Sequence, residues 1–234
     1  MRDLVLHSDE TIEDLQIKGL KIIQKKKGFR FGMDAVLLSN FAEVKKGAHV
    51  LDIGTGTGII PLLISAKTEA DKIIGIEIQE HMAEMAQRSV RINNLEDRIK
   101  IINADIREYN KYFKKSSFDV VVSNPPYIKN NGGLKNIEHT VAISRHEISC
   151  TLEDIICAAS ILLKQSGQLV MVHKPERLAD IICTMRKYKI EPKFMKFVHP
   201  KIHQKPNLVL IRGVKGGNTF LKILEPLYVT EGDI

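Results

Sequence analysis

The sequence predicts an α/β fold in which a mostly parallel sheet carries helices on both faces. From residue 49 onward, apolar runs rich in Val and Ile alternate with helical segments, which is typical of a parallel sheet buried on both sides. A glycine-rich turn lies where the first of these runs meets the first helix. A chain of 234 residues also buries about 70% of its unfolded surface, so one core forms without disulfides.

The first 45 residues have a different pattern from the rest. Residues 4–6 and 20–23 are predicted as short strands around a polar turn, and residues 25–28 as a basic turn. Residues 33–41 place apolar side chains at helical spacing and are predicted as an amphipathic helix. The chain is thus expected to consist of an N-terminal extension packed on a main domain, followed by a C-terminal tail. In that order, these parts cover residues 1–45, 46–214 and 215–234.

The main domain is predicted to alternate strands and helices and then to close with an antiparallel pair. The expected strands cover residues 49–53, 72–78, 99–102, 118–123, 168–173, 194–198 and 208–214. The expected helices cover residues 59–66, 80–93, 151–164 and 176–187. Thr151 is a candidate cap for the third of these helices, with Asp154 as its capping-box partner. The result is a seven-stranded, mostly parallel sheet with an antiparallel closing strand.

Composition excludes several classes of protein. Hydrophobic residues make up 44% and charged residues 27% of the chain, which excludes wholesale disorder. The three cysteines, an odd number without a Cys-x-x-Cys pair, argue for a reducing cytoplasm and against a zinc site. No signal-peptide core opens the chain, and no apolar run approaches the ~20 residues of a membrane span. We expect a cytoplasmic protein without a membrane or a metal.

The charge balance favours a polyanionic partner. Lys and Arg number 35 against 28 Asp and Glu, which gives a formal net charge of +7 and a pI near 9.2. Nucleic acid is the commonest polyanion that such a surface attracts. A soluble basic protein without such a partner remains the alternative on charge alone.

Residues 52–58, Asp-Ile-Gly-Thr-Gly-Thr-Gly, follow the first strand of the main domain. Glycines at this turn let the backbone approach a ligand closely. The run lacks the third glycine of Gly-x-Gly-x-x-Gly, because Ile59 stands there, and no Gly-Lys-Ser/Thr occurs. Neither a dehydrogenase nor a P-loop is therefore indicated. Asp52, Glu77 and Asp105 are all expected at the carboxyl ends of neighbouring strands, where ligands of such sheets bind.

These residues resemble the first motifs of the class I S-adenosylmethionine-dependent methyltransferases, which have a Rossmann-like fold. The resemblance implies that the glycine loop wraps the methionine part of the cofactor. It also implies that Glu77 holds the ribose, that Asp105 lies near the adenine amine, and that Asp52 acts directly or through water. The cofactor-binding residues implied are Asp52, Gly54, Thr55, Gly56, Gly58, Glu77, Ile78, Asp105, Ile106 and Asn124. An ordinary strand–helix turn with solvated acids is the alternative.

Asn124-Pro125-Pro126-Tyr127 follows the fourth strand of the main domain. The prolines fix the backbone, and the Asn124 side-chain oxygen and the Pro125 carbonyl offer the two acceptors that an amino nitrogen needs. Tyr127 offers a ring on which a planar group stacks. Hydrogen bonds that tighten as the nitrogen becomes tetrahedral favour the transition state. We therefore predict these four residues as catalytic in methyl transfer to a conjugated nitrogen, without a general base.

The same run resembles the Asn-Pro-Pro-Tyr motif of amino-methyltransferases, whose members act on adenine, cytosine or a glutamine side chain. The chain lacks room for the target-recognition domain of DNA enzymes, and its N-terminal segment is unlike the helical domain of the release-factor glutamine methyltransferases. Guanine enzymes of rRNA usually end the motif with Phe. A protein glutamine methyltransferase, another RNA amino-methyltransferase and a catalytically silent nucleic-acid-binding module stay open as alternatives.

Two further segments resemble the small bacterial tRNA adenine-N6 methyltransferases, whose type member modifies the anticodon loop of a valine tRNA. They are residues 27–38 and residues 144–147, Ser-Arg-His-Glu, where the family usually has Ala first. The resemblance implies tRNA as substrate partner and S-adenosylmethionine as cofactor, and we expect a monomer.

Three basic groups are candidates for contacts with RNA phosphates. The first is Lys25, Lys26, Lys27 and Arg30, the second is Lys129, Lys135 and Arg145, and the third is Lys201, His203 and Lys205. The substrate residues predicted from them are Lys26, Lys27, Arg30, Lys129, Arg145 and Lys205. A solvated face is the alternative for each group. His199 and His203 are four residues apart, but Pro200 follows the first and no acid or Cys lies nearby, so we read them as loop residues and not as metal ligands.

Overall fold

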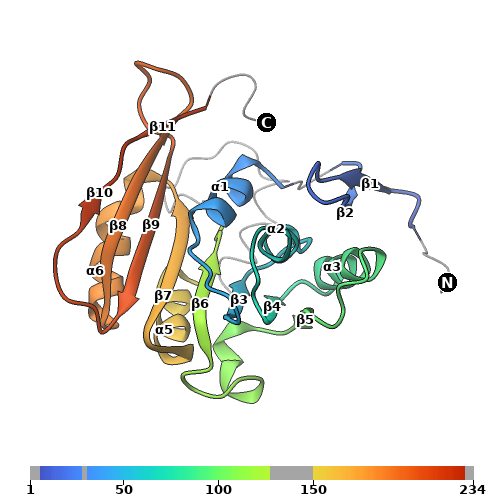
Figure 1. Cartoon of the computed structure of the whole chain (residues 1–234), viewed down its shortest axis with the longest axis horizontal. Coiled ribbons are helices and arrows are strands. Elements are labelled where there is room, and N and C mark those ends of the chain that lie inside the picture. Colours follow the sequence, from blue (N-terminus) through green and yellow to red (C-terminus); the bar gives the residue numbers. More distant parts are fainter. Residues whose placement is uncertain (1–5, 28–30, 127–149, 230–234) are drawn as a thin grey trace, which may run out of the picture.

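The computed structural model describes residues 6–27, 31–126 and 150–229. Two sheets are formed there (Figure 1). A small antiparallel hairpin pairs β1 with β2, and a nine-stranded sheet has the order β10-β8-β9-β7-β6-β3-β4-β5, with β11 also paired to β8. The strands are β1 Glu10–Asp14, β2 Lys21–Lys25, β3 His49–Ile53, β4 Lys72–Glu77, β5 Ile99–Asn103, β6 Phe118–Ser123, β7 Leu163–His173, β8 Ile190–His199, β9 Leu208–Lys215, β10 Lys222–Ile223 and β11 Leu227–Tyr228.

Helices cover both faces of the large sheet. They are α1 Met33–Phe41, α2 Ile59–Lys67, α3 Glu80–Ile92, α5 Leu152–Leu162 and α6 Leu178–Lys187, with 3₁₀ helices at Ile106–Lys111 and Pro175–Arg177. One apolar cluster joins α1, α2 and α3 to the sheet, and a second joins α5 and α6 to the other face. The two-sided burial explains why the central strands consist of continuous Val and Ile runs. Within the described residues, each helix is too short or too polar to cross a membrane.

The predicted α/β class and the seven strands from β3 to β9 are confirmed. β3, β4, β5, β6 and β7 are parallel, and β9 is the antiparallel strand between β7 and β8. The capping box of Thr151 and Asp154 at the start of α5 is present as expected. The sheet is larger than predicted because β10 and β11, in the segment predicted as a tail, both pair with β8.

Several predicted boundaries were wrong; β8, for example, begins at Ile190 instead of residue 194. The first strand of the hairpin is β1, residues 10–14, and not residues 4–6; its Glu10 is buried against Arg88 of α3, a contact that local sequence cannot reveal. α5 ends at Leu162 and β7 begins at Leu163 instead of residue 168, because Leu163 pairs with Phe118 of β6 ahead of a bulge.

The hairpin packs against α3 and ends near the edge of the sheet where β6 ends. The backbone N–H of Ile23 donates to the Ser89 hydroxyl at 3.0 Å, and Lys21 exchanges hydrogen bonds with the Asn93 side chain. Asn93 ends α3 at the amino edge of the sheet, so β2 runs from the amino edge toward the carboxyl edge. The hairpin and β10 lie at opposite ends of the molecule (Figure 1).

Candidate active site

β3 and β6 are neighbours in the sheet, and their last residues are in register. Ile53 pairs with Ser123, and the Ser123 hydroxyl donates a hydrogen bond of 2.9 Å to the Ile53 carbonyl. Gly54 and Asn124 are the next residues along the two strands. The glycine loop and the Asn-Pro-Pro segment thus begin side by side at the carboxyl edge, although 70 residues separate Ile53 from Ser123.

The glycine loop has a backbone that favours glycine. Gly54, Gly56 and Gly58 have φ values of 76°, 55° and 85°, which residues with a Cβ rarely adopt. A Cβ on Gly58 would lie 3.1 Å from the Cβ of Ala86 in α3, so the start of α2 packs tightly on that helix. The loop is tied to β4, since the N–H groups of Gly54 and Thr55 both donate to the Ile76 carbonyl.

Two threonine hydroxyls of the loop are buried without a hydrogen-bond partner among the described residues, those of Thr55 and Thr57. Thr55 has room because β4 carries a glycine opposite it: a Cβ on Gly75 would lie 2.7 Å from the Thr55 hydroxyl oxygen. Orphaned polar atoms cost free energy, roughly 1–3 kcal/mol each. A polar ligand that reached the loop would satisfy these two hydroxyl groups.

Asp52 is fully buried in β3, directly before the loop. Neither of its carboxylate oxygens has a hydrogen-bond partner in the described part of the chain. Burial is the main reason that the pKa of Asp52 is raised to about 7; the nearby Thr55 hydroxyl opposes this rise, and the negative charge of Glu77 contributes to it. A carboxyl group in this state gains from a nearby cationic or amine-bearing ligand, which favours its ionised form.

Glu77 ends β4 and is 5% exposed. One carboxylate oxygen accepts the backbone N–H of Gly56 at 2.9 Å, and the other accepts that of Gln79, also at 2.9 Å. A carboxylate has about four acceptor positions, so lone pairs stay available for two hydroxyl groups. This geometry fits the predicted binding of a ribose.

Asp105 lies after β5 and caps the following 3₁₀ helix through a hydrogen bond from the Arg107 backbone. The Arg107 guanidinium also pairs with it, and these hydrogen bonds hold the pKa of Asp105 below its usual value. The predicted contact with an adenine amine would therefore have to share this carboxylate with Arg107. The Ile78 side chain beside Glu77 is exposed, whereas Ile106 is buried in the core beneath the site.

The Asn-Pro-Pro segment follows β6 directly and is neither helix nor strand. Asn124 is partly buried, Pro125 is buried and Pro126 is exposed. Tyr127, the fourth predicted catalytic residue, lies outside the described residues. The described part of the motif stands next to the glycine loop, so the site brings together the predicted cofactor and acceptor residues.

The predicted RNA contacts are only partly described. Lys26 and Lys27 are exposed beyond the end of β2, and Lys205 is exposed in the connection between β8 and β9. The other three predicted contacts, Arg30, Lys129 and Arg145, lie outside the described residues.

Sequence reasoning missed Thr57 and His173. Thr57 lies between Gly56 and Gly58, and this position in the glycine loop could have identified it from the sequence. His173 ends β7 next to β6, is 4% exposed and accepts the Lys174 backbone N–H through Nδ1. Burial lowers the pKa of His173 to about 4, so it is neutral at physiological pH.

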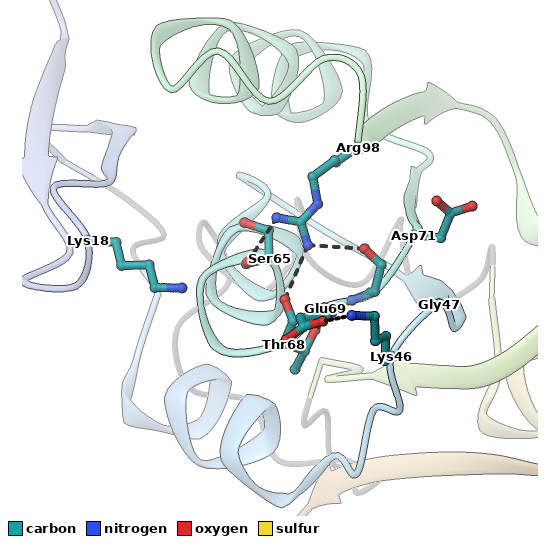
Figure 2. Close-up of a pocket in the computed structure, with 9 residues that line it drawn as sticks. Lys18, Lys46, Gly47, Ser65, Thr68, Glu69, Asp71 and Arg98 are labelled. Carbon is teal, nitrogen blue, oxygen red and sulfur yellow. Dashed lines mark hydrogen bonds and ion pairs between the residues drawn. The ribbon is translucent and has the colours of Figure 1, made fainter.

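A cavity of about 470 Å³ lies at the opposite, amino edge of the sheet (Figure 2). Its lining includes Arg98, which donates hydrogen bonds to the carbonyls of Ser65, Thr68 and Ala70 at the end of α2. Lys46 pairs there with Glu69 at 2.8 Å. Arg98, Lys46 and Glu69 thus serve the end of a helix and an ion pair, and the cavity is remote from the glycine loop.

Comparison with known proteins identifies the class. Residues 32–188 match the methyltransferase small domain family. This match spans most of the chain, including the glycine loop, Glu77 and the Asn-Pro-Pro-Tyr run. The chain belongs to the methyltransferase small domain family.

Particular relatives narrow this class. The chain is 34% identical over 187 residues to the tRNA1(Val) (adenine(37)-N6)-methyltransferase of Porphyromonas gingivalis, covering 77% of this chain and 72% of the relative. Among solved structures, a predicted O-methyltransferase of Agrobacterium tumefaciens has a TM-score of 0.69 at 24% identity, over 86% of this chain and 90% of that one. A geranyl diphosphate methyltransferase in complex with SAM has a TM-score of 0.58 at 14% identity, over 77% and 84%. The structural likenesses show the class I methyltransferase fold.

Proposed function

We propose that the chain transfers a methyl group from S-adenosylmethionine to the exocyclic amino nitrogen of an adenine in tRNA, with the anticodon loop of a valine tRNA as the favoured target. The observation that carries the proposal is the register of Ile53 with Ser123, which sets the glycine loop beside the Asn-Pro-Pro segment. The likeness to the tRNA1(Val) (adenine(37)-N6)-methyltransferase of Porphyromonas gingivalis supports adenine as the methylated base and tRNA as the substrate.

The cofactor side of the site is formed by three groups of this chain. S-adenosylmethionine supplies an electrophilic methyl group on a positively charged sulfur. The backbone of Gly54–Gly58 and the buried Thr55 and Thr57 hydroxyls bind its polar end, where Asp52 gains a cationic partner. Glu77, held by Gly56 and Gln79, accepts the ribose hydroxyls.

The acceptor side of the site holds the adenine amine. The Asn124 side-chain oxygen and the Pro125 carbonyl each accept one N–H, which directs the nitrogen lone pair toward the methyl group. As the nitrogen becomes tetrahedral it gains positive charge, so both hydrogen bonds strengthen in the transition state. Tyr127 gives the base a ring to stack on. The surplus proton leaves after transfer, and no general base is required.

The same proposal covers the organisation of the chain. Residues 46–214 form the catalytic domain, and residues 1–45 form an extension that supports it through Leu20, Ile22 and Leu38 in the core. Residues 215–234 form the C-terminal segment, which adds β10 and β11 to the sheet edge. The protein acts as a monomer in the cytoplasm, where tRNA is found.

The test is methyl transfer from isotope-labelled S-adenosylmethionine into total tRNA that lacks the modification, run beside a release-factor protein. We expect label in the tRNA and none in the protein. Label in the release factor alone would overturn the proposal in favour of glutamine methylation. Absence of cofactor binding would instead leave a catalytically silent binding module.

A further inference from the structure

The positive charge of the chain is concentrated in one segment, residues 192–224. This segment contains no Asp or Glu and seven Lys and Arg residues, as many as the net charge of +7 for the whole chain. The remainder of the chain is therefore balanced in charge. The seven cations are Lys193, Lys196, Lys201, Lys205, Arg212, Lys215 and Lys222. An acid-free segment of this kind produces a local positive potential that attracts polyanions.

The segment lies at the β8–β9–β10 end of the sheet (Figure 1). β8 and β7 are both antiparallel to β9, and β7 is parallel to β6, so β8 runs in the direction of β6. Residues 200–207, which join β8 to β9, therefore leave the sheet at the same edge as Asn124. We call residues 200–207 the β8–β9 loop.

Three of the seven cations have structural partners. Arg212 is 4% exposed, pairs with Glu43 at 2.6 Å and lies over the ring of Phe194. Lys193 and Lys215 donate hydrogen bonds to backbone carbonyls. These side chains hold the edge of the sheet and do not present their charge to a ligand.

Lys201 and Lys205 are different. Both are exposed, and neither has an ion-pair or hydrogen-bond partner for its ammonium group in residues 6–27, 31–126 and 150–229. They lie four residues apart in the β8–β9 loop, at the carboxyl edge of the sheet where Asn124 also lies. Their charge is therefore available to a ligand that reaches the site.

The β8–β9 loop is an ordered platform for these two lysines. A hydrogen bond of 2.7 Å joins His199 Nδ1 to the Gln204 carbonyl, and the Asn207 backbone donates to the Val198 carbonyl at 2.9 Å. The His199 ring also contacts that of Tyr228 in β11, with centroids 5.2 Å apart. Because the loop is fixed before binding, less entropy is lost when its lysines meet phosphates.

The basic residues at the end of the hairpin are less available to a ligand than Lys201 and Lys205. Lys25 pairs with Asp9 at 2.5 Å, and Lys26 donates to the Ser8 carbonyl at 2.9 Å. Strand β1 adds Glu13 and Asp14, while its third acid, Glu10, is already paired with Arg88. Local acids cancel much of the charge there, so the hairpin is the weaker candidate for a phosphate contact.

We propose that the β8–β9 loop binds the sugar–phosphate backbone of the substrate RNA, with Lys201 and Lys205 contacting phosphates that flank the target nucleotide. This inference rests on the proposed function and specifies that the basic group with Lys201 and Lys205 binds the RNA backbone. A backbone contact positions the strand and carries no base information. The loop thus contributes to affinity for RNA, and the glycine loop and Asn124 act on the cofactor and the base.

The test compares two double variants of equal charge change. Lys201→Ala with Lys205→Ala alters the loop, and Lys114→Ala with Lys115→Ala removes two exposed lysines near the start of β6, at the amino edge. Binding of a fluorescent valine tRNA transcript is measured over a series of salt concentrations. Affinity for S-adenosylmethionine is measured by calorimetry, and KM and kcat for tRNA complete the set.

The loop variant is expected to bind tRNA roughly tenfold or more weakly at low salt, with a salt slope smaller by about 1 for each lysine removed. KM for tRNA rises, while cofactor affinity stays at the wild-type value. A loop variant that binds tRNA like the amino-edge variant overturns the inference. Because binding is measured apart from transfer, loop-dependent tRNA binding without methylation would overturn the proposed function and support the loop.

Discussion

The carboxylate of Glu77 accepts a hydrogen bond from the backbone N–H of Gly56 at 2.9 Å, which joins the end of β4 to the glycine loop after β3. The Gln79 N–H holds its other oxygen. Both oxygens therefore have fixed positions before a ligand arrives, and little ordering is left to do on binding.

Replacing Glu77 by Gln tests this arrangement. The amide keeps one acceptor oxygen but loses the charge, so the loop contact and the ribose contact cannot both be kept. Hydrogen bonds to charged groups contribute roughly 1.5–3 kcal/mol, and we expect S-adenosylmethionine to bind about tenfold or more weakly by calorimetry. Glu80→Gln, an exposed change three residues away, serves as the control. Equal affinities in the two variants would remove Glu77 from the site.

The raised pKa of Asp52 predicts that the stability of the ligand-free protein depends on pH. The folded protein holds the Asp52 proton with a pKa of about 7, against 3.8 for an ordinary aspartate. Folding therefore favours the protonated form, so the stability contributed by Asp52 is fully present below about pH 4 and is lost as pH rises toward 7. The loss is at most roughly 4 kcal/mol. In urea unfolding across this range, Asp52→Asn should lack that decline. Parallel pH profiles for both proteins would contradict the assignment.

The same residue predicts how cofactor affinity depends on pH. A positively charged ligand favours ionised Asp52, so binding expels a proton when the group is protonated beforehand. Affinity for S-adenosylmethionine should rise between pH 6 and pH 8 in the wild type and stay flat in Asp52→Asn. Calorimetry in buffers of different ionisation enthalpy also reports the proton released. An identical rise in the variant would exclude Asp52 as its source.

Much of the fold and of this site follows from local sequence. The runs at β3 and β6, the Thr151–Asp154 capping box and the glycines of the loop are signals carried by adjacent residues, and the structure has each where it was predicted. Parallel strands end at one edge, so the neighbouring positions of Asp52, Glu77 and Asp105 also followed.

Features that depend on contacts between residues far apart in the sequence could not be predicted from it. β1 consists of the polar run Glu-Thr-Ile-Glu-Asp, and its place depends on Arg88 of α3. β10 and β11 are two-residue strands whose only signal is their pairing with β8. The space that Gly75 leaves for Thr55 likewise joins two strands and leaves no local pattern.

We expect the contact of Glu10 with Arg88 to hold the hairpin against α3. Arg88 donates two hydrogen bonds of 2.7 Å to Glu10 and also pairs with Glu84. Glu10→Gln removes this carboxylate but leaves the Arg88–Glu84 pair in place, so we expect a loss below the ~3–5 kcal/mol of a fully broken buried pair. Urea unfolding measures this loss of stability, and the hairpin of the variant should also be cleaved faster by a protease. Adding Arg88→Met should recover stability, because no buried charge is then left over; a further loss in the double variant would contradict this account.

The Arg88 guanidinium also lowers the pKa of Glu10 to about 2, from 4.5. The ionised form is favoured by folding, so this stabilisation is present above about pH 4.5 and disappears as pH falls toward 2. Acid unfolding of Glu10→Gln should therefore differ least from the wild type near pH 2 and most at neutral pH. A constant difference across this range would contradict the linkage.

The measurement that tests the central claim most directly is nucleoside mass analysis of tRNA after reaction with the wild type and with Asn124→Ala. The wild type should yield adenosine methylated on its exocyclic amine. Asn124→Ala should yield almost none while it binds S-adenosylmethionine like the wild type, because only the acceptor for the amine is lost. A methyl group on a ring nitrogen or a ribose, or full turnover in the variant, would contradict the account.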